Sequence, residues 1–202
     1  MKYICSILLC LILSNPVLSQ KESLNKKPYH VRLAYVNVNV GPIDDNYMNG
    51  AVGFNFIFNN NWGGSFDFLS YIKKASDLPS NFSPGLMQGT PSDKLKTISF
   101  RVNREIITKS KQIRLGIETG FSIVTYQKLF FYPNTSSGWF GSNYIQSEFT
   151  YQSLGLSAKA KLALLLSRRF GVEFAAIANI NQYQNVFGGQ IGIMLGKVNE
   201  KF

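Results

Sequence analysis

Charged residues recur at alternate positions within otherwise apolar segments, and they are the residues of this chain best placed to do chemistry. They are Asp67, Arg101, Arg114, Glu118, Lys159, Lys161 and Glu173. Four are basic and three are acidic, so their charges nearly balance. Balanced charges on one face of neighbouring strands predict ion pairs with a structural role. We favour this interpretation over a proton or ion pathway.

Catalytic and metal-binding patterns are scarce in the sequence. His30 is the only histidine, so no pair of histidines has the spacing of a zinc site. Asp44 and Asp45 are adjacent in a segment rich in Gly, Pro and Asn, where we expect solvated carboxylates rather than an acid pair or half of a Ca²⁺ site. We therefore predict no catalytic, cofactor-binding or metal-binding residues, and no cofactor.

The charged residues belong to segments in which apolar residues alternate with polar ones. From Ile113 to Thr125 the odd positions are mostly apolar, whereas the even ones include Arg114 and Glu118. This period of two is that of a β-strand with two different faces. An Arg or Lys that faces lipid near the bilayer midplane costs roughly 2–4 kcal/mol. The charged face must therefore lie inside and the apolar face outside.

Eight segments carry this alternation. The pattern predicts strands over residues 30–40, 48–58, 62–73, 94–104, 112–126, 150–165, 170–181 and 186–198. The parity of apolar residues changes within the first strand, between Tyr35 and Val36, which predicts a bulge or an end buried on both faces.

The lengths of the connections give the strands a direction. Residues 59–61, 105–111 and 166–169 are short connections, whereas residues 41–47, 74–93, 127–149 and 182–185 join the other strands. Short turns on the periplasmic side and longer loops outside are typical of outer-membrane barrels. The fold class that we predict is all-β: an eight-stranded antiparallel up-and-down transmembrane β-barrel with both chain ends in the periplasm.

Two other folds compete with the barrel. Residues 104–111 and 157–169 are rich in helix formers, and propensity alone predicts helices there. A soluble sandwich would bury the phenylalanines of the apolar face between two sheets. We prefer a barrel in lipid, with Trp62, Tyr71, Tyr126 and Tyr151 in the aromatic girdles at the headgroups.

The first residues predict export. Lys2 precedes an apolar run from Ile4 to Leu13. Residues 17–19 are small or aliphatic, as a signal peptidase requires, and we expect cleavage after Ser19. The predicted domains are a signal peptide (1–19), a periplasmic segment (20–29) and the barrel (30–202). Cys5 and Cys10 lie in the removed segment, so the mature chain has no thiol. An uncut N-terminal anchor and lipidation at Cys10 are the alternatives.

The chain is basic, with a formal net charge of +10. The positive residues form no stripe with interleaved aromatic residues, so we do not expect nucleic acid as a partner. Basic turns and loops fit the anionic headgroups of outer-membrane lipid and lipopolysaccharide.

The chain resembles the small eight-stranded outer-membrane β-barrel domain proteins of Gram-negative bacteria. Residues 1–19, 50–56 and 188–196 carry this resemblance, with the terminal Phe202. The resemblance implies an outer-membrane location and insertion by the barrel-assembly machinery. It matches no member of known activity, and the outer loops lack the histidine that a lipid A-modifying barrel requires.

These observations predict a non-enzymatic integral barrel with a plugged polar lumen and a structural or surface-binding role. The segment 127–149 is rich in aromatic residues, and we expect it to contact a surface glycan or protein. The candidate contact residues are Phe131, Tyr132, Trp139, Phe140 and Tyr144. Packing of these rings onto the barrel rim is the structural alternative. A soluble, lipocalin-like barrel that binds a small apolar ligand and an outer-membrane lipid-modifying enzyme are the alternative functions.

Overall fold

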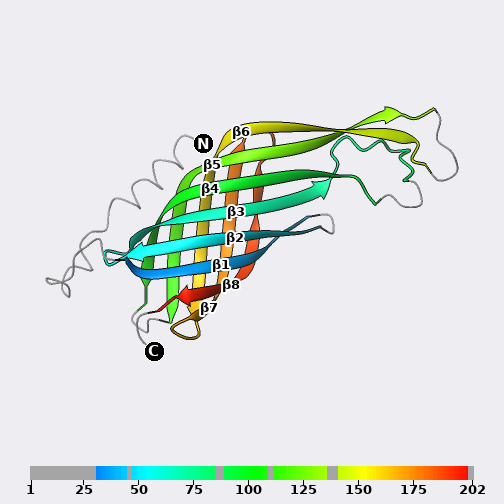
Figure 1. Ribbon diagram of the computed structural model, residues 1–202. Coiled ribbons are helices and arrows are strands. Elements are labelled where there is room, and N and C mark those ends of the chain that lie inside the picture. Colours follow the sequence, from blue (N-terminus) through cyan, green and yellow to red (C-terminus); the bar gives the residue numbers. More distant parts are fainter. Residues whose placement is uncertain (1–30, 45–46, 85–88, 109–111, 136–140, 200–202) are drawn as a thin grey trace.

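The computed structural model describes residues 31–44, 47–84, 89–108, 112–135 and 141–199, which form an all-β fold (Figure 1). The strands are β1 (Val31–Asp44), β2 (Tyr47–Phe58), β3 (Trp62–Lys74), β4 (Ser92–Ile107), β5 (Ile113–Pro133), β6 (Tyr144–Leu165), β7 (Phe170–Asn181) and β8 (Val186–Lys197). The predicted signal peptide and periplasmic segment, His30, Asp45, Trp139 and Phe140 lie outside the described residues.

The strands form a closed barrel in which every strand pairs antiparallel with its neighbours in sequence. The ring closes between β1 and β8, where Val38 lies opposite Ile193. The predicted eight-stranded up-and-down barrel is confirmed. The helices that propensity favours at residues 104–111 and 157–169 are wrong, because β4 continues to Ile107 and β6 continues to Leu165. Pairing on both sides of a strand outweighs the helix propensity of its residues.

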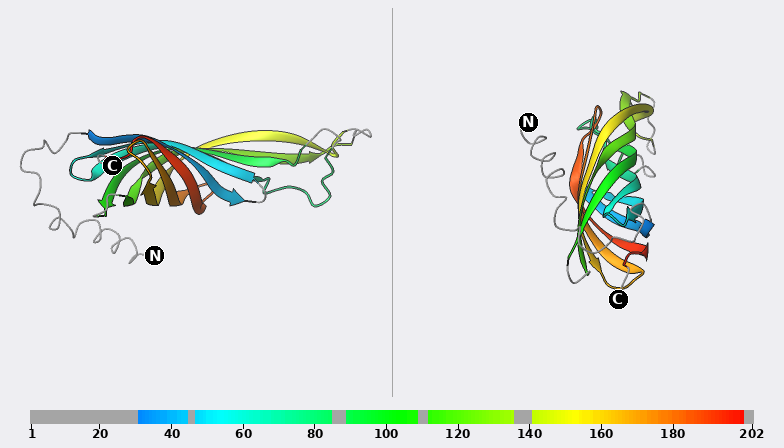
Figure 2. Two further views of the ribbon diagram at one scale, coloured as in Figure 1. Left: turned by 90° about the horizontal axis from the view of Figure 1, so that it is seen from below. Right: turned by 90° about the vertical axis from the view of Figure 1, so that its left-hand side faces the viewer.

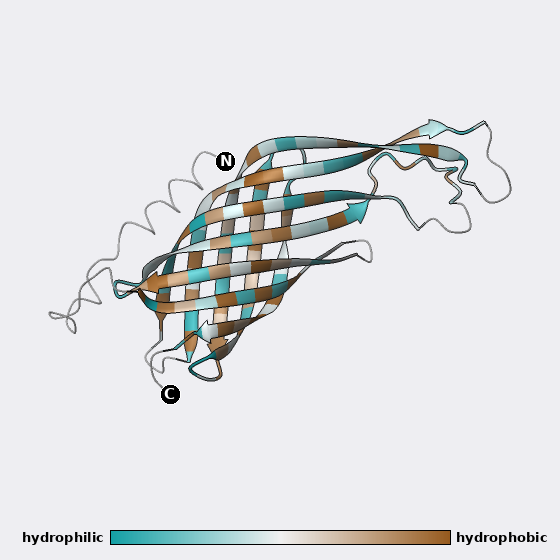
Figure 3. Ribbon diagram, in the orientation of Figure 1, coloured by the Kyte–Doolittle hydropathy of each residue, from teal (hydrophilic) through white to brown (hydrophobic). Residues whose placement is uncertain are grey.

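Side chains alternate between the lumen and the outside, as the hydropathy colours in Figure 3 show. In β1, Val36 and Val38 are exposed and Asn37 is buried. A bulge between Tyr35 and Val36 is wrong, because β1 pairs with β2 without a shift from Leu33 to Val40, and the register shifts lie between Val31 and Leu33 and between Val40 and Ile43. The parity of apolar residues changes there because Leu33 and Tyr35 point into the lumen, where they are buried. No helix among the described residues is long and apolar enough to cross a membrane.

The phenylalanines of the apolar face point outward. Phe54 is 46% exposed, Phe100 is 40% exposed and Phe187 is 62% exposed. A sandwich would bury these rings between two sheets, so that interpretation is wrong. A lipocalin-like barrel needs a polar exterior and an apolar interior, and this barrel has the opposite arrangement.

Apolar side chains close both ends of the lumen. One cluster, at the end that holds the described chain termini, contains Leu33, Tyr35, Ile57, Ala163, Leu165, Met194 and Val198. The other, at the opposite end, contains Ala51, Leu69, Tyr71, Leu95, Val124, Tyr126 and Val186, with Tyr151 and Ile177 packed against it. The predicted girdle positions of Tyr71, Tyr126 and Tyr151 are therefore wrong. These rings have inward parity, and they fill the lumen mouth rather than the headgroup region.

Strands β5 and β6 extend well beyond the barrel. They contain 21 and 22 residues, whereas the other strands contain 12 to 16. Figure 2 shows the pair projecting as a two-stranded hairpin. The prediction of a loop over residues 127–149 is therefore wrong for most of that segment. Its aromatic residues favour a strand, and the two strands pair residue by residue as far as Pro133 and Tyr144.

Candidate functional sites in the lumen and on the protruding hairpin

Lys161 lies at the centre of a buried ion-pair network. It points inward from β6, and its Nζ lies 2.9 Å from Oε1 of Glu105 and 2.6 Å from Oε1 of Glu118. The same Nζ donates a hydrogen bond of 2.9 Å to the hydroxyl of Tyr35. That hydroxyl donates in turn to Oε1 of Glu105 at 3.1 Å. Lys161 thus connects Tyr35 on β1, Glu105 on β4 and Glu118 on β5.

Arg101 extends the network toward β3. Its guanidinium pairs with the carboxylate of Asp67 and lies 3.0 Å from Oε2 of Glu118. It also donates a hydrogen bond of 2.9 Å to Oγ of Ser157. Arg101 therefore links β3, β5 and β6 across the lumen.

Two further ion pairs complete the network. Nη1 of Arg114 lies 2.9 Å from Oε2 of Glu105, and Nζ of Lys159 lies 2.5 Å from Oε1 of Glu173. Asn39 donates a further hydrogen bond of 3.1 Å to Oε1 of Glu173. Each carboxylate of the network is thus held by at least one cation.

All the charged residues singled out from the sequence lie together inside the barrel, and each is at most 8% exposed. Sequence reasoning missed Glu105, which it placed in a turn. Glu105 is 2% exposed and shares the inward parity of Arg101 and Asn103, so extending the alternation by one pair of residues finds it. With Glu105 the network has four basic and four acidic groups, and its formal charge is zero.

Glycines make room for the longest side chains of the lumen. Gly116 on β5 lies opposite Lys161 on β6. A Cβ on Gly116 would lie 2.5 Å from Cε of Lys161, and a Cβ on Gly53 would lie 1.8 Å from Oδ1 of Asp67. Contacts this short require the charged side chains to move, so the lumen is filled to close packing around the network.

The protruding hairpin is fixed to the barrel through Asp93. This carboxylate lies beyond the apolar belt, next to the outward-facing Lys94, and accepts hydrogen bonds from N–H of Ser76 at 3.0 Å and of Leu129 at 3.1 Å. The hydroxyls of Ser76 and Tyr126 donate to it at 2.7 Å and 3.0 Å. Burial alone would raise the pKa of Asp93, but these hydrogen bonds outweigh it and lower that pKa below its usual value. Ionised Asp93 therefore ties the β3–β4 connection to β5.

One face of the hairpin is covered by the β3–β4 connection. The ring of Phe82 lies 5.7 Å from that of Phe131 and 6.3 Å from that of Tyr144. The hydroxyl of Tyr144 donates a hydrogen bond of 2.8 Å to Oδ1 of Asn81. Phe131 and Tyr144, two of the predicted contact residues, therefore pack the outer segments together.

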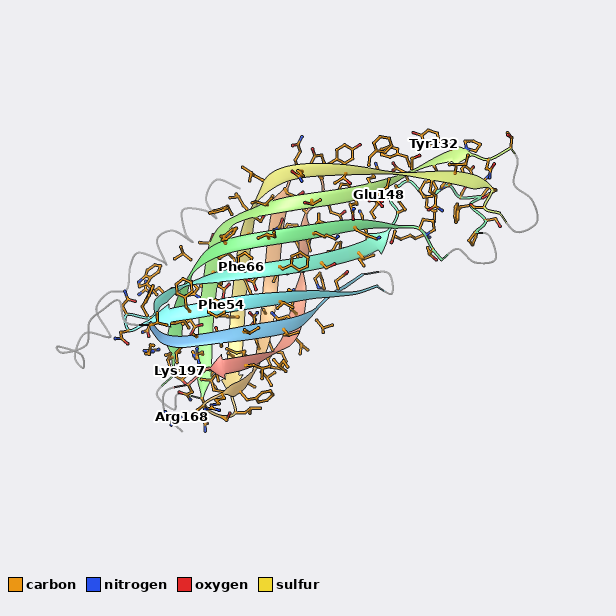
Figure 4. All side chains as sticks on the ribbon, viewed as in Figure 1. Phe54, Phe66, Tyr132, Glu148, Arg168 and Lys197 are labelled. Atoms are coloured by element: carbon orange, nitrogen blue, oxygen red, sulfur yellow. The ribbon has the colours of Figure 1, made fainter. Side chains whose placement is uncertain are left out.

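The opposite face of the hairpin is largely exposed. We call it the aromatic face, and it consists of Lys128, Phe130, Tyr132, Ile145 and Phe149. At its base, Nζ of Lys128 lies 2.7 Å from Oδ2 of Asp77 in the β3–β4 connection. Tyr132 lies directly opposite Ile145, and Lys128 lies opposite Phe149, so these side chains share one side of the ribbon. Tyr132 is 50% exposed, Ile145 54% and Phe149 46%. The rings of Phe130 and Phe149 meet edge to face at 5.2 Å. Figure 4 labels Tyr132 near the tip of the hairpin.

The hairpin also presents a strand edge. β7 pairs with β6 only from Gly155 onward, so residues 144–154 of β6 have no β7 residues opposite them. This edge contains no Pro or Lys, and Glu148 is its only charged residue. Proteins commonly block exposed edges with Pro or with charged residues such as Lys, because an open edge pairs readily with another strand.

No family model matches the sequence, and no curated protein sequence matches it. Solved structures match at the level of the fold. Neisserial surface protein A is 14% identical, with a TM-score of 0.53, over 83% of this chain and 99% of that protein. This chain has the fold of the small eight-stranded outer-membrane β-barrels. The N-terminal β-barrel domain of Pseudomonas aeruginosa OprF is 8% identical, with a TM-score of 0.50, over 82% of this chain and 98% of that domain.

Ail of Yersinia pestis, solved with the heparin analogue sucrose octasulfate, is 15% identical over 81% of this chain and 94% of that protein, with a TM-score of 0.45. Among the described residues no group of His, Cys, Asp or Glu side chains is arranged to hold a metal ion.

Proposed function

We propose that this protein is an integral outer-membrane barrel that reaches the membrane by Sec-type export, loses residues 1–19 and is inserted by the barrel-assembly machinery. The distribution of side chains carries this proposal. Phenylalanines and aliphatic residues are exposed around the wall, whereas the charged residues of the network are buried. An apolar surface of this extent needs lipid to cover it. The exposed Lys94 and Lys96, next to the apolar belt at the hairpin end, fit the phosphates of lipopolysaccharide.

The barrel has a structural rather than a transport or catalytic role in this proposal. Eight strands leave an interior just wide enough for side chains to fill. Here the ion-pair network occupies the middle, and apolar clusters close both ends. The charged side chains bind one another, so none of them is presented to a substrate. We infer a plugged lumen without a diffusion pore and without enzymatic activity.

The protruding hairpin is the binding element of the proposal, and its partner is an extracellular protein. The edge of β6 over residues 144–154 supports this choice, because an extended segment of a partner can add to it as a further strand. The aromatic face beside this edge supplies exposed rings that bury apolar area at low entropic cost. A surface glycan is the second candidate, because flat exposed rings such as Tyr132 also stack on sugars.

A matched set of variants tests the binding role. The probe is a library of displayed extended peptides, panned against the barrel in lipid nanodiscs. Replacement of Tyr132 and Ile145 by Ala should reduce the retention of selected peptides about tenfold or more, since exposed aromatic anchors dominate such interfaces. Phe131→Ala changes the packed face and should reduce it much less. Equal losses from both variants would refute a binding role for the aromatic face.

Labelling tests the orientation. A cysteine in place of Tyr132 should react with a membrane-impermeant maleimide in intact cells, because the hairpin faces outward. A cysteine in place of the exposed Arg168, in the β6–β7 turn, should react only after the outer membrane is opened. Labelling of the Arg168 position in intact cells would contradict the proposed topology.

A further inference from the structure

The outer wall of the barrel carries an apolar groove with a volume of about 1640 Å³. It runs across β4 to β8 and reaches β1 and the start of β3, and among its lining residues are Val38, Val102, Ile117, Ala160, Phe174 and Ile193. Ile117 is 51% exposed, whereas the adjacent Glu118 is 1% exposed. The groove therefore lies on the outside of the wall and not in the lumen.

Small residues line part of this groove. On β6 and β7 the outward positions are Ala158, Ala160, Ala176 and Ala178, and they face one another in register. On β2 to β4 the outward positions carry bulky rings, such as Phe54, Phe66 and Phe100. β4 and β5 also bend strongly along their length, as Figures 1 and 2 show. The short alanine side chains leave space on this part of the wall.

A cation lies at one end of the groove. Arg104 and Trp62 both line it, and the guanidinium carbon of Arg104 lies 5.2 Å from the centroid of the Trp62 ring. Both residues are at the end of the barrel that holds the described chain termini. Arg168 and Lys197, labelled in Figure 4, are exposed at the same end.

We propose that the groove binds one phospholipid of the periplasmic leaflet, with its acyl chains along the alanines and its phosphate on Arg104. The inference rests on the proposed function, which places the rim with Arg104 in the periplasm. The apolar lining fits hydrocarbon, and the volume exceeds the roughly 300–1,000 Å³ of ordinary small-molecule pockets. The charge is complementary, because a guanidinium binds phosphate oxygens with two parallel hydrogen bonds. The neighbouring basic rim draws anionic headgroups to the site.

Native mass spectrometry of the full barrel, released from bilayers of phosphatidylethanolamine and phosphatidylglycerol, tests the proposal. The wild-type barrel should retain one phospholipid. Replacing Ala160 and Ala176 by Phe fills the groove and should reduce the retained fraction about tenfold. Arg104→Gln removes the phosphate contact and should reduce it by a similar factor. The matched controls are Val52→Phe, on the outer wall away from the groove, and Lys74→Gln, at an exposed position of the opposite rim. Both should retain lipid like the wild type.

Several results would overturn the proposal. Equal lipid retention by the groove variants and the controls would show that the groove selects no lipid. A dimer mass without lipid, abolished by the Ala160 and Ala176 replacements, would show that a second copy occupies the groove. A heat-dependent gel shift, measured for every variant, separates this failure from that of the proposed function. Folded barrels without a retained lipid refute only the groove, whereas a protein that stays soluble without detergent refutes both.

Discussion

Lys161→Met is the sharpest test of the lumen network. The substitution keeps most of the side-chain length and removes the cation that Glu105 and Glu118 share at 2.9 and 2.6 Å. Each carboxylate keeps one partner, because Glu105 still pairs with Arg114 and Glu118 still pairs with Arg101. The lumen nevertheless changes from a balance of four cations and four anions to an excess of one buried negative charge.

The expected loss of stability follows from that excess negative charge. Removing one partner of a buried ion pair typically destabilises a protein by about 3–5 kcal/mol. The carboxylates are still partly paired, so we expect Lys161→Met to lower the free energy of unfolding by about 3 kcal/mol. Adding Glu118→Gln restores the charge balance and leaves Arg101 paired with Asp67. The double variant should therefore be more stable than the sum of the two single effects, by about 1–3 kcal/mol.

Reversible urea unfolding in detergent, followed by tryptophan fluorescence, measures these free energies. Lys96→Met is the matched control, because Lys96 is exposed and should change stability by less than about 0.5 kcal/mol. A cost below about 1 kcal/mol for Lys161→Met, or strictly additive effects in the double variant, would refute the inference that the ion pairs hold the lumen together.

Further predictions concern the hairpin, the wall and the lumen. Hydrogen exchange, corrected for intrinsic rates, should show the amides of Ser76 and Leu129 protected at neutral pH. The lowered pKa of Asp93 means that this protection persists above the ordinary value of 3.8 and is lost as the pH falls through the lowered value. Asp93→Ala removes both acceptor oxygens and should lose the protection at every pH. Protection of the wild type that is independent of pH would contradict this role. Gly120→Ala places a Cβ 1.9 Å from the carbonyl oxygen of Phe100 and should cost about 1–3 kcal/mol in urea unfolding, whereas Gly89→Ala meets open space and should be neutral. Liposomes that contain the barrel should release small solutes no faster than protein-free liposomes, and release that rises with protein content would rule out a plugged lumen.

The alternation of side chains made the barrel predictable from the sequence. A strand with one face in lipid and one in a polar lumen has a strict period of two, so residues such as Arg101 and Glu118 were placed on the inner face from parity alone. The ends of the strands were harder to place. Glu105 was assigned to a turn because few alternating residues follow it, so the pattern does not mark where the strand ends. Its pairing with Lys161 depends on the register between strands, which the sequence of one strand does not specify.

The aromatic residues show a second limit of sequence reasoning. Tyr71 and Tyr126 were assigned to the lipid headgroups because tyrosine is common there, yet their parity directs them into the lumen mouth. Residues 127–149, which form most of the hairpin, were assigned to a loop because the alternation with lipid-facing apolar residues ends before them. A two-stranded ribbon in water needs no apolar face toward lipid, so the signal that located the other strands is absent from this part of β5 and β6.

The outer-membrane fraction, resolved on a denaturing gel with and without boiling, tests the integral barrel most directly. A closed barrel with paired strands and a filled lumen should stay folded in the unboiled sample and migrate differently from the boiled one. The protein should be found in the membrane fraction and require detergent for extraction. A protein that is soluble without detergent and migrates identically in both samples would contradict the integral barrel.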